Sequence, residues 1–126
     1  MRYGLVGASG RMGGEIRKAF AAHELTFSLD VGGETHDAAP QVLVDFSLPA
    51  AFPSTVAAAR RFVCPLVIGT TGLSAEQLAE LRTLGEQVAV VQSFNFATGV
   101  TLLKMMLREF ARSSRTGTSR SARRTT

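Results

Sequence analysis

Three glycines near the start of the chain have the spacing of a phosphate-binding turn. Gly7, Gly10 and Gly13 stand three residues apart, directly after an apolar run. In a dinucleotide-binding turn the first glycine permits a tight bend out of a strand, the second lets the backbone approach a pyrophosphate, and the third allows close helix–strand packing. The spacing is G-x-x-G-x-x-G rather than G-x-G-x-x-G, so a plain flexible turn is the alternative reading.

A carboxylate stands where such a turn needs a ribose ligand. Asp30 lies about 20 residues after Gly10, at the end of the next apolar run. There it would bind the adenosine ribose hydroxyls, and it disfavours a 2′-phosphate; a solvated strand-end acid is the alternative. Arg11 could still reach a 2′-phosphate. The predicted cofactor is therefore NAD(H), with NADP(H) left open.

Small and polar residues also follow three later apolar runs. They are Asp45-Phe46-Ser47, Gly69-Thr70-Thr71-Gly72 and Ser93-Phe94-Asn95-Phe96. Parallel sheets bind ligands beyond the carboxyl ends of their strands, so these segments are expected at one rim. There Gly69 would let the backbone approach a nicotinamide ring, and the two threonines would supply hydroxyls.

The elements that must position these residues form an alternating series. Apolar strands alternating with helices predict an α/β fold, a Rossmann-like parallel sheet with helices on both faces. One connecting helix is expected to be replaced by a loop, because the roughly ten residues after residue 31 have no helical period. Ser74 and Gln77 have the spacing of a capping box. Strands are expected at 2–7, 25–31, 42–44, 66–68 and 88–91, and helices at 11–22, 49–61, 74–84 and 100–110.

Composition divides the chain into a body and a tail. The 126 residues carry a net charge of +4, but residues 111–126 hold five arginines and no acid, so the body is near neutral. This Ser/Thr/Arg-rich tail is expected to be disordered, after a dinucleotide-binding domain over 1–110. No apolar stretch reaches the roughly 18 residues of a membrane span, and no signal peptide is recognisable. With one cysteine, no disulfide framework is expected and the cytoplasm is the default location.

Four segments together resemble a known family. VGASGRMG, VDFSLPAA, VIGTTGLS and QSFNFATGV, in this order and spacing, are similar to the N-terminal half of 4-hydroxy-tetrahydrodipicolinate reductase (dihydrodipicolinate reductase) over about residues 1–110. The resemblance implies an NAD(P)H-dependent oxidoreductase of lysine and diaminopimelate biosynthesis, reducing 4-hydroxy-tetrahydrodipicolinate to tetrahydrodipicolinate. It implies a dicarboxylate substrate, no membrane and no nucleic acid. The family is homotetrameric, a state doubtful for this chain alone.

The resemblance also implies roles for individual residues. One group would hold the pyrophosphate: Gly7, Ala8, Ser9, Gly10, Arg11 and Met12. Asp30 would bind the adenosine ribose, and Phe46 would pack near the cofactor. The nicotinamide side would be lined by Gly69, Thr70, Thr71, Ser93, Phe94, Asn95 and Phe96. No metal site is predicted.

The family's catalytic segment has no counterpart in this sequence. Its second domain carries a His-His-x-x-Lys motif and a Ser-Gly-Thr loop, and neither occurs here. His23 is expected at a helix end and His36 in a solvated loop, while Cys64 is expected to be a buried small hydrophobe. No catalytic residue is assigned, and the chain is expected to bind nucleotide with negligible turnover. A change of reading frame near residues 111–112 would account for the tail.

Two other functions compete with this reading. One is a non-catalytic nucleotide-binding module whose basic tail binds nucleic acid. The other is a semialdehyde dehydrogenase, which uses a similar glycine turn but needs a nucleophilic cysteine at a strand–helix junction. Cys64 precedes a predicted strand, which argues against the second.

Overall fold

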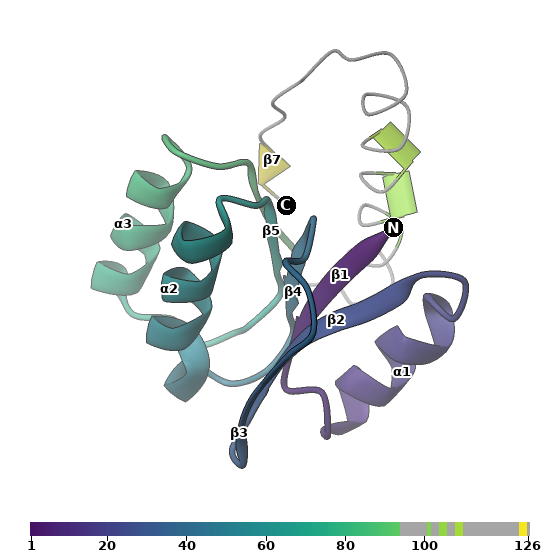
Figure 1. The fold of residues 1–126 in the computed structure, drawn as a ribbon. Helices are drawn as coiled ribbons and strands as arrows, with labels where there is room; N and C mark the ends of the chain where they lie inside the picture. The colour runs from purple at the N-terminus through teal and green to yellow at the C-terminus, as the bar shows by residue number, and fades with distance from the viewer. Residues whose placement is uncertain (94–100, 102–103, 106–107, 110–123, 126) are drawn as a thin grey trace.

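The computed structural model describes residues 1–93, 101, 104–105, 108–109 and 124–125. Figure 1 shows helices packed on both sides of a central twisted sheet. The helices are α1 (Arg11–Ala19), α2 (Phe52–Phe62) and α3 (Ala75–Leu84), and a short 3-10 helix, η1 (Pro49–Ala51), leads into α2. The strands are β1 (Arg2–Val6), β2 (Glu24–Asp30), β3 (Gly33–His36), β4 (Leu43–Asp45), β5 (Leu66–Ile68), β6 (Val90–Gln92) and β7 (Arg124–Thr125).

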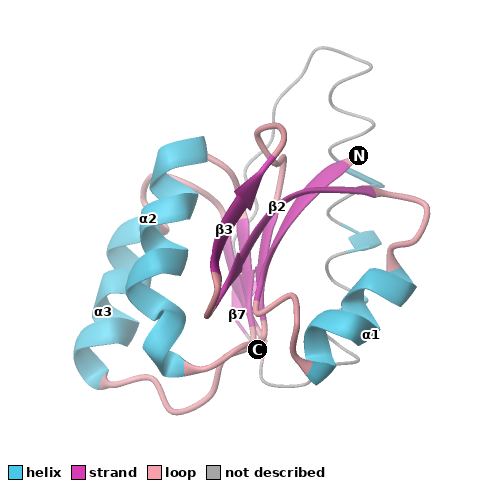
Figure 2. Ribbon diagram, turned by 60° about the horizontal axis from the view of Figure 1, so that its bottom comes forward, coloured by secondary structure: helices cyan, strands magenta, loops and turns pink. Residues whose placement is uncertain are grey.

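The sheet has the strand order β3-β2-β1-β4-β5-β6-β7. Every neighbouring pair is parallel except β2 and β3, which pair antiparallel. Figure 2 shows α1 on one face and α2 with α3 on the other. The predicted α/β class and parallel sheet are confirmed, and the five predicted strands are all present. From β1 the chain adds β2 on one side of the sheet and later adds β4 on the other, so the carboxyl ends of β1, β2 and β4 meet at a switch point.

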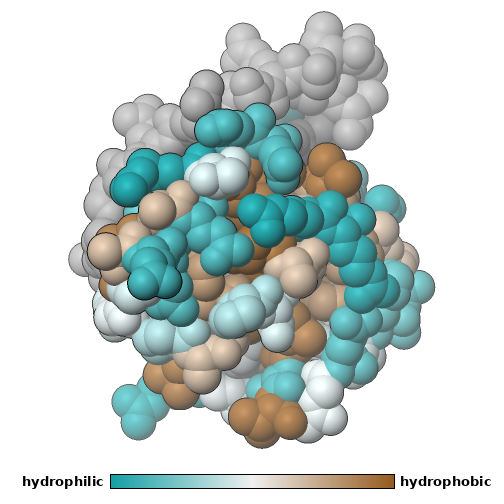
Figure 3. Space-filling view, turned by 90° about the vertical axis from the view of Figure 1, so that its left-hand side faces the viewer, coloured by the Kyte–Doolittle hydropathy of each residue, from teal (hydrophilic) through white to brown (hydrophobic). Residues whose placement is uncertain are grey.

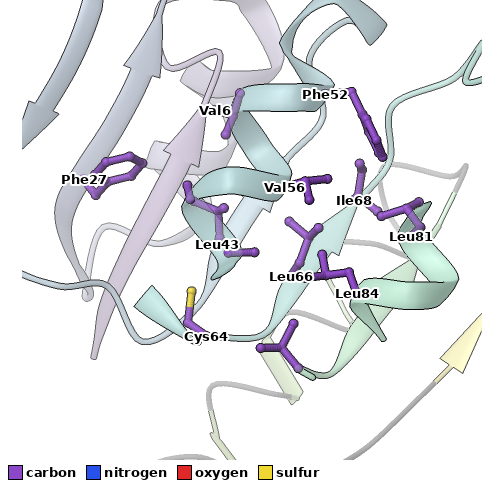
Figure 4. Packing of buried hydrophobic residues seen from close by; sticks show 13 residues of the cluster. Val6, Phe27, Leu43, Phe52, Val56, Cys64, Leu66, Ile68, Leu81 and Leu84 are labelled. Carbon is purple, nitrogen blue, oxygen red and sulfur yellow. The ribbon is translucent and has the colours of Figure 1, made fainter. Parts of the chain in front are cut away.

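The central strands β4 and β5 are buried along their whole length because both faces of the sheet are covered there. Val42 and Val44 pack with Ile16 and Phe20 of the α1 side, whereas Leu43 between them packs on the α2–α3 side. Figure 4 shows the cluster on the α2–α3 side, in which Phe52, Ile68 and Leu81 lie together. Alternate residues of one strand therefore serve two cores, and no polar face remains.

The connection after β2 differs from the predicted loop. No helix is present, as expected, but residues 33–36 form β3, which pairs with β2 as an edge strand. Gly33 has φ +120°, a conformation that glycine adopts readily, and it allows the reversal. Arg61 of α2 holds the edge strand, donating to both carboxylate oxygens of Glu34 at 3.1 and 3.0 Å.

Helix boundaries agree with the prediction except at two ends. α1 ends at Ala19 instead of residue 22, and Phe20 then donates its N–H to the Ile16 carbonyl at 2.9 Å. Residues 49–51 form η1 rather than the first turn of α2. The Ser74–Gln77 capping box is confirmed in both directions, with 2.9 and 3.1 Å bonds.

Two predicted features fall largely outside the described residues. Of the helix expected at 100–110, the described residues 101, 104–105 and 108–109 are helical. Of the tail expected at 111–126, only β7 is described, and it pairs with β6.

None of the described helices has the length and apolarity needed to cross a membrane. Figure 3 shows the face of the molecule that carries α2 and α3 as a mixture of hydrophilic and hydrophobic residues.

Candidate functional site

A cleft of about 530 Å³ opens where the carboxyl ends of β1, β2 and β4 meet. One wall is the glycine turn with the start of α1, and a second is the end of β2 with Asp30 and Val31. The third wall is the segment from Phe46 to Leu48, followed by residues of η1 and α2. Its volume is in the range of small-molecule sites, and its position is the usual ligand site of an open α/β sheet.

Two of the three turn glycines are required by the protein itself. Gly7 has φ +79°, and a Cβ there would lie 2.9 Å from the Ser47 Cβ. A Cβ on Gly13 would overlap the Gly7 carbonyl and lie 2.6 Å from the Ala8 carbonyl oxygen. The first and third glycines thus serve the bend and the helix–strand contact, as the spacing predicts.

At position 10, by contrast, no neighbouring residue of the protein requires a glycine. Its φ is −78°, which any residue adopts, and a Cβ there would meet only the Gly7 carbonyl oxygen, at 3.4 Å. Gly10 lines the cleft as the N-cap of α1, without a side-chain cap on the helix. The first amides of a helix have no carbonyl partner within it, and the helix dipole favours an anion there. An absent side chain at this position leaves those amides open to a ligand.

Asp30 points toward the turn rather than away from it. Its Oδ2 accepts the backbone N–H of Ser9 at 2.9 Å, and its Oδ1 accepts the Ser9 hydroxyl at 2.8 Å. Next to it, Gly7 donates its N–H to the Leu29 carbonyl at 2.8 Å. The end of β2 and the glycine turn therefore form one unit at the mouth of the cleft. Arg11 and Asp30 are the charged members of the cleft lining in the described part of the chain.

A buried carboxylate supports the third wall. Asp45 is fully buried at the end of β4 and accepts the Ser47 N–H at 2.8 Å, the Ser47 hydroxyl, and the Thr55 hydroxyl at 2.7 Å. These bonds tie the loop after β4 to α2. Asp45 is therefore a structural support beneath the cleft, and Ser47 presents its Cβ to Gly7.

Phe46 and Gly69 form a closely packed pair. A Cβ on Gly69 would overlap the Phe46 ring and approach the Ser93 carbonyl oxygen to 2.8 Å. Phe46 thus occupies the side of Gly69 from which a side chain is missing, where we expected a nicotinamide ring to approach. Thr70 beside it is 2% exposed, and its hydroxyl has no hydrogen-bond partner among the described residues. Thr71 is exposed, and Ser93 is buried.

The remaining candidates lie away from the cleft or outside the described residues. His23 follows α1, and burial, with a smaller effect of the N-terminal charge, lowers its pKa. His36 lies on the edge strand β3, where its Nδ1 is 3.2 Å from a guanidinium nitrogen of Arg61 in α2. Cys64 is buried, and burial raises the pKa of its thiol to about 12. The predicted positions Phe94, Asn95 and Phe96 fall in the range 94–100, outside the described residues.

Comparison with known proteins assigns the chain to one family. The family model described as "Dihydrodipicolinate reductase, N-terminus" matches residues 28–96, which is more than half of the chain. The chain belongs to this family. The matched range includes Asp30 and the segments after β4 and β5, and the glycine turn precedes it.

The names of individual relatives match the dihydrodipicolinate reductase family. The 4-hydroxy-tetrahydrodipicolinate reductase of Thermosipho africanus is 38% identical over 109 residues, covering 85% of this chain and 50% of the relative. That of Halorhodospira halophila is 45% identical over 75 residues, covering 60% of this chain and 28% of the relative. The chain therefore spans about half the length of the curated relatives it matches, or less.

A solved structure in the same family has the same fold. It is described as dipicolinate-bound dihydrodipicolinate reductase from Paenisporosarcina sp. TG-14. The TM-score is 0.63 at 23% sequence identity, over 78% of this chain and 48% of that one. The solved structure supports the fold, and the family model confirms the resemblance identified in the sequence.

Some cleft residues were not singled out from the sequence. Val31, Leu48 and Ser54 line the cleft, and the first two are large apolar side chains that are strongly exposed. Val31 directly follows β2, and Leu48 follows the segment after β4. Val31 and Leu48 would have been included if each predicted strand-end motif had been extended by one or two residues.

Proposed function

We propose that this chain is the cofactor-binding part of an NAD(P)H-dependent reductase that converts 4-hydroxy-tetrahydrodipicolinate to tetrahydrodipicolinate in lysine and diaminopimelate biosynthesis. The observation that carries the proposal concerns Gly10. No neighbouring residue requires a glycine at this position, and the lack of a side chain leaves the start of α1 open to the cleft. Family membership and the names of the relatives support the reaction.

The cleft is proposed to hold the pyrophosphate, the adenosine ribose and the adenine of the dinucleotide. The amides at the start of α1 would hold the pyrophosphate, helped by the absence of any acidic residue in the first turn of that helix. Asp30 would accept hydrogen bonds from the adenosine ribose. Val31 and Leu48, 107% and 71% exposed, would provide apolar surface for the adenine.

The nicotinamide end is proposed to lie toward the ends of β5 and β6. The bound cofactor supplies a hydride from the nicotinamide. Thr70 supports this placement, because a buried hydroxyl without a partner among the described residues is suited to a carboxamide. Phe46, packed on Gly69, would give the ring an apolar wall. Thr71, Ser93, Phe94, Asn95 and Phe96 remain predicted members of this end.

We propose that NADH is preferred over NADPH. The carboxylate of Asp30 would repel a 2′-phosphate, and Arg11 is the one cation in the cleft lining of the described residues. Substrate binding, proton donation and tetramer formation are proposed to reside in the remaining half of the relatives' length. This chain is accordingly expected to bind nucleotide with negligible turnover.

Titration of the purified chain with NADH and with NADPH tests the proposal. We expect NADH to bind and the Asp30→Ala variant to bind it about tenfold more weakly, through loss of hydrogen bonds to a charged group. Asp37→Ala, an exposed acid outside the cleft lining, is the control and should not change either affinity. A chain that is folded by circular dichroism and binds neither nucleotide would reject the proposal. Salt-dependent nucleic-acid binding that is lost on deletion of residues 112–126 would favour the alternative module.

A further inference from the structure

Ser9 and Asp30 are joined by two hydrogen bonds at the mouth of the cleft. Ser9 is exposed, and Asp30 is half-buried. Ser9 donates twice, from its backbone N–H to Oδ2 and from its hydroxyl to Oδ1, at 2.9 and 2.8 Å. Both carboxylate oxygens are therefore held by one residue, which fixes the orientation of the carboxylate as well as its position.

We propose that Ser9 is a positioning residue that makes the cleft selective for nucleotides whose adenosine ribose carries a free 2′-hydroxyl. The inference rests on the proposed function, because it concerns a nucleotide in this cleft. It adds a residue and a role to that proposal: Asp30 contacts the ribose, and Ser9 determines how Asp30 presents its acceptors.

The first step of the argument is the number of acceptors left on Asp30. An ionised carboxylate has about four lone-pair sites on its two oxygens. Ser9 uses one on each oxygen, so one on each oxygen remains. The two hydroxyls of an unmodified ribose are two donors side by side, and they match this arrangement. A carboxylate that rotated freely would have to lose that freedom on binding, which weakens affinity.

The second step is the rigidity of the support. Ser9 lies in the turn whose N–H groups at Gly7 and Gly10 bond to the Leu29 and Gly7 carbonyls at 2.8 and 3.0 Å. The turn is thus tied to the end of β2 on the residue next to Asp30. Ser9 and Asp30, 21 positions apart in sequence, are therefore joined both by their own two bonds and by the bonds of the turn.

The third step is the response to a 2′-phosphate. A phosphate replaces a donor with acceptor oxygens and brings close to two negative charges to a fixed carboxylate. A held carboxylate cannot turn away to reduce the repulsion. Loss of the Ser9 hydroxyl would leave only the backbone bond to Oδ2, and the carboxylate could then rotate about that bond. Selectivity, rather than overall affinity alone, should therefore change.

A purely architectural role is the competing explanation. In that case the two bonds would only tie the turn to β2, and their loss would weaken both nucleotides alike and lower the melting temperature. The ratio of the two dissociation constants separates the explanations, because general loosening of the turn does not distinguish a 2′-hydroxyl from a 2′-phosphate.

The test is calorimetric titration of the full 126-residue chain and its variants with NADH and NADPH. In Ser9→Ala we expect NADH to bind about tenfold more weakly and NADPH to bind as well or somewhat better, because the carboxylate can turn away from the 2′-phosphate, so the NADPH-to-NADH ratio of dissociation constants falls at least about tenfold. Ser9→Thr keeps the hydroxyl and should retain the wild-type ratio within about twofold. Thr83→Ala, which removes an exposed hydroxyl on α3, is the matched control and should leave both values unchanged.

Several outcomes would overturn the inference. They are equal weakening of both nucleotides in Ser9→Ala, no change in that variant, or the same loss of selectivity in Ser9→Thr. A wild-type chain that binds NADH but shows no preference over NADPH also contradicts it, while leaving the proposed function standing. A folded wild-type chain that binds neither nucleotide rejects the proposed function, and the inference with it.

Discussion

Gly10 and Gly13 lie in the same turn but are glycines for different reasons. A Cβ at Gly13 would overlap backbone, whereas one at Gly10 would meet a single carbonyl oxygen at 3.4 Å. Packing therefore explains Gly13, whereas the protein itself gives no reason for Gly10, which we attribute to the proposed nucleotide. A matched pair of substitutions at these positions separates folding from binding.

We expect Gly10→Ser to fold with a melting temperature near that of the wild type, because serine is a good N-cap residue. Its side chain would occupy the phosphate position and weaken NADH binding at least about tenfold. Gly13→Ser should instead destabilise the fold by about 2 kcal/mol or more, because backbone must move. Thermal melts and NADH titration of both variants check this. Equal loss of stability in the two variants would contradict it.

Asp45 carries three hydrogen bonds in a fully buried position. Asp45→Ala would leave the Ser47 N–H and hydroxyl without their acceptor, although the Thr55 hydroxyl keeps the Ala51 carbonyl at 3.1 Å, so we expect a loss of about 3 kcal/mol in the free energy of unfolding. Urea denaturation measures it. Asp37→Ala, an exposed acid, should change stability by no more than about 0.5 kcal/mol. A small effect at Asp45 would show that its bonds are replaced by water.

Burial lowers the reactivity of the Cys64 thiol. Its pKa of about 12 exceeds the ordinary thiol value of about 8.5, so the folded state favours the protonated thiol. Stability from this burial is complete below about pH 8.5 and declines as pH rises from there toward 12, because the unfolded chain ionises first. At pH 7.5 the native chain should react with a disulfide reagent far more slowly than the urea-unfolded chain. Rapid native reaction would contradict the described burial.

At the scale of elements, helix ends show where local sequence is decisive. The capping box at Ser74 needs only residues three apart, and it forms as predicted. We expect Ser74→Ala to lower the free energy of unfolding by about 1 kcal/mol, measured by urea denaturation. Thr83→Ala near the other end of α3 is the control, and an equal loss there would indicate a general effect on the helix.

The end of α2 contains a conformation that its residue does not favour. Val63 has φ +47° and ψ +52°, and its side chain is 71% exposed. A β-branched residue in this region costs about 1–2 kcal/mol. Val63→Gly should therefore stabilise the chain by about 0.5 to 1 kcal/mol, measured as a higher urea midpoint. Val63→Ala keeps a Cβ in the same conformation and should not gain as much.

At the scale of the whole molecule, the sheet brings the candidate site together. Strand order places the ends of β1, β2 and β4 side by side, although they are separated in sequence. The glycine turn, Asp30 and Ser47 meet for this reason alone. The alternation of apolar strands with helices along the sequence was enough to predict the parallel sheet and its two covered faces, because strands such as β4 and β5 contribute residues to both cores.

The features that sequence alone determined are those encoded within a few neighbouring residues. The glycine spacing, the capping box and the short apolar runs each act through local geometry, and family membership followed from the motifs. Tertiary structure alone decided that Arg61 holds β3 through Glu34, and that Gly69 accommodates Phe46. It also decided that Ser9 holds Asp30. Each of these is a contact between residues at least 20 positions apart, so its energy depends on how the chain folds back, which no local pattern records.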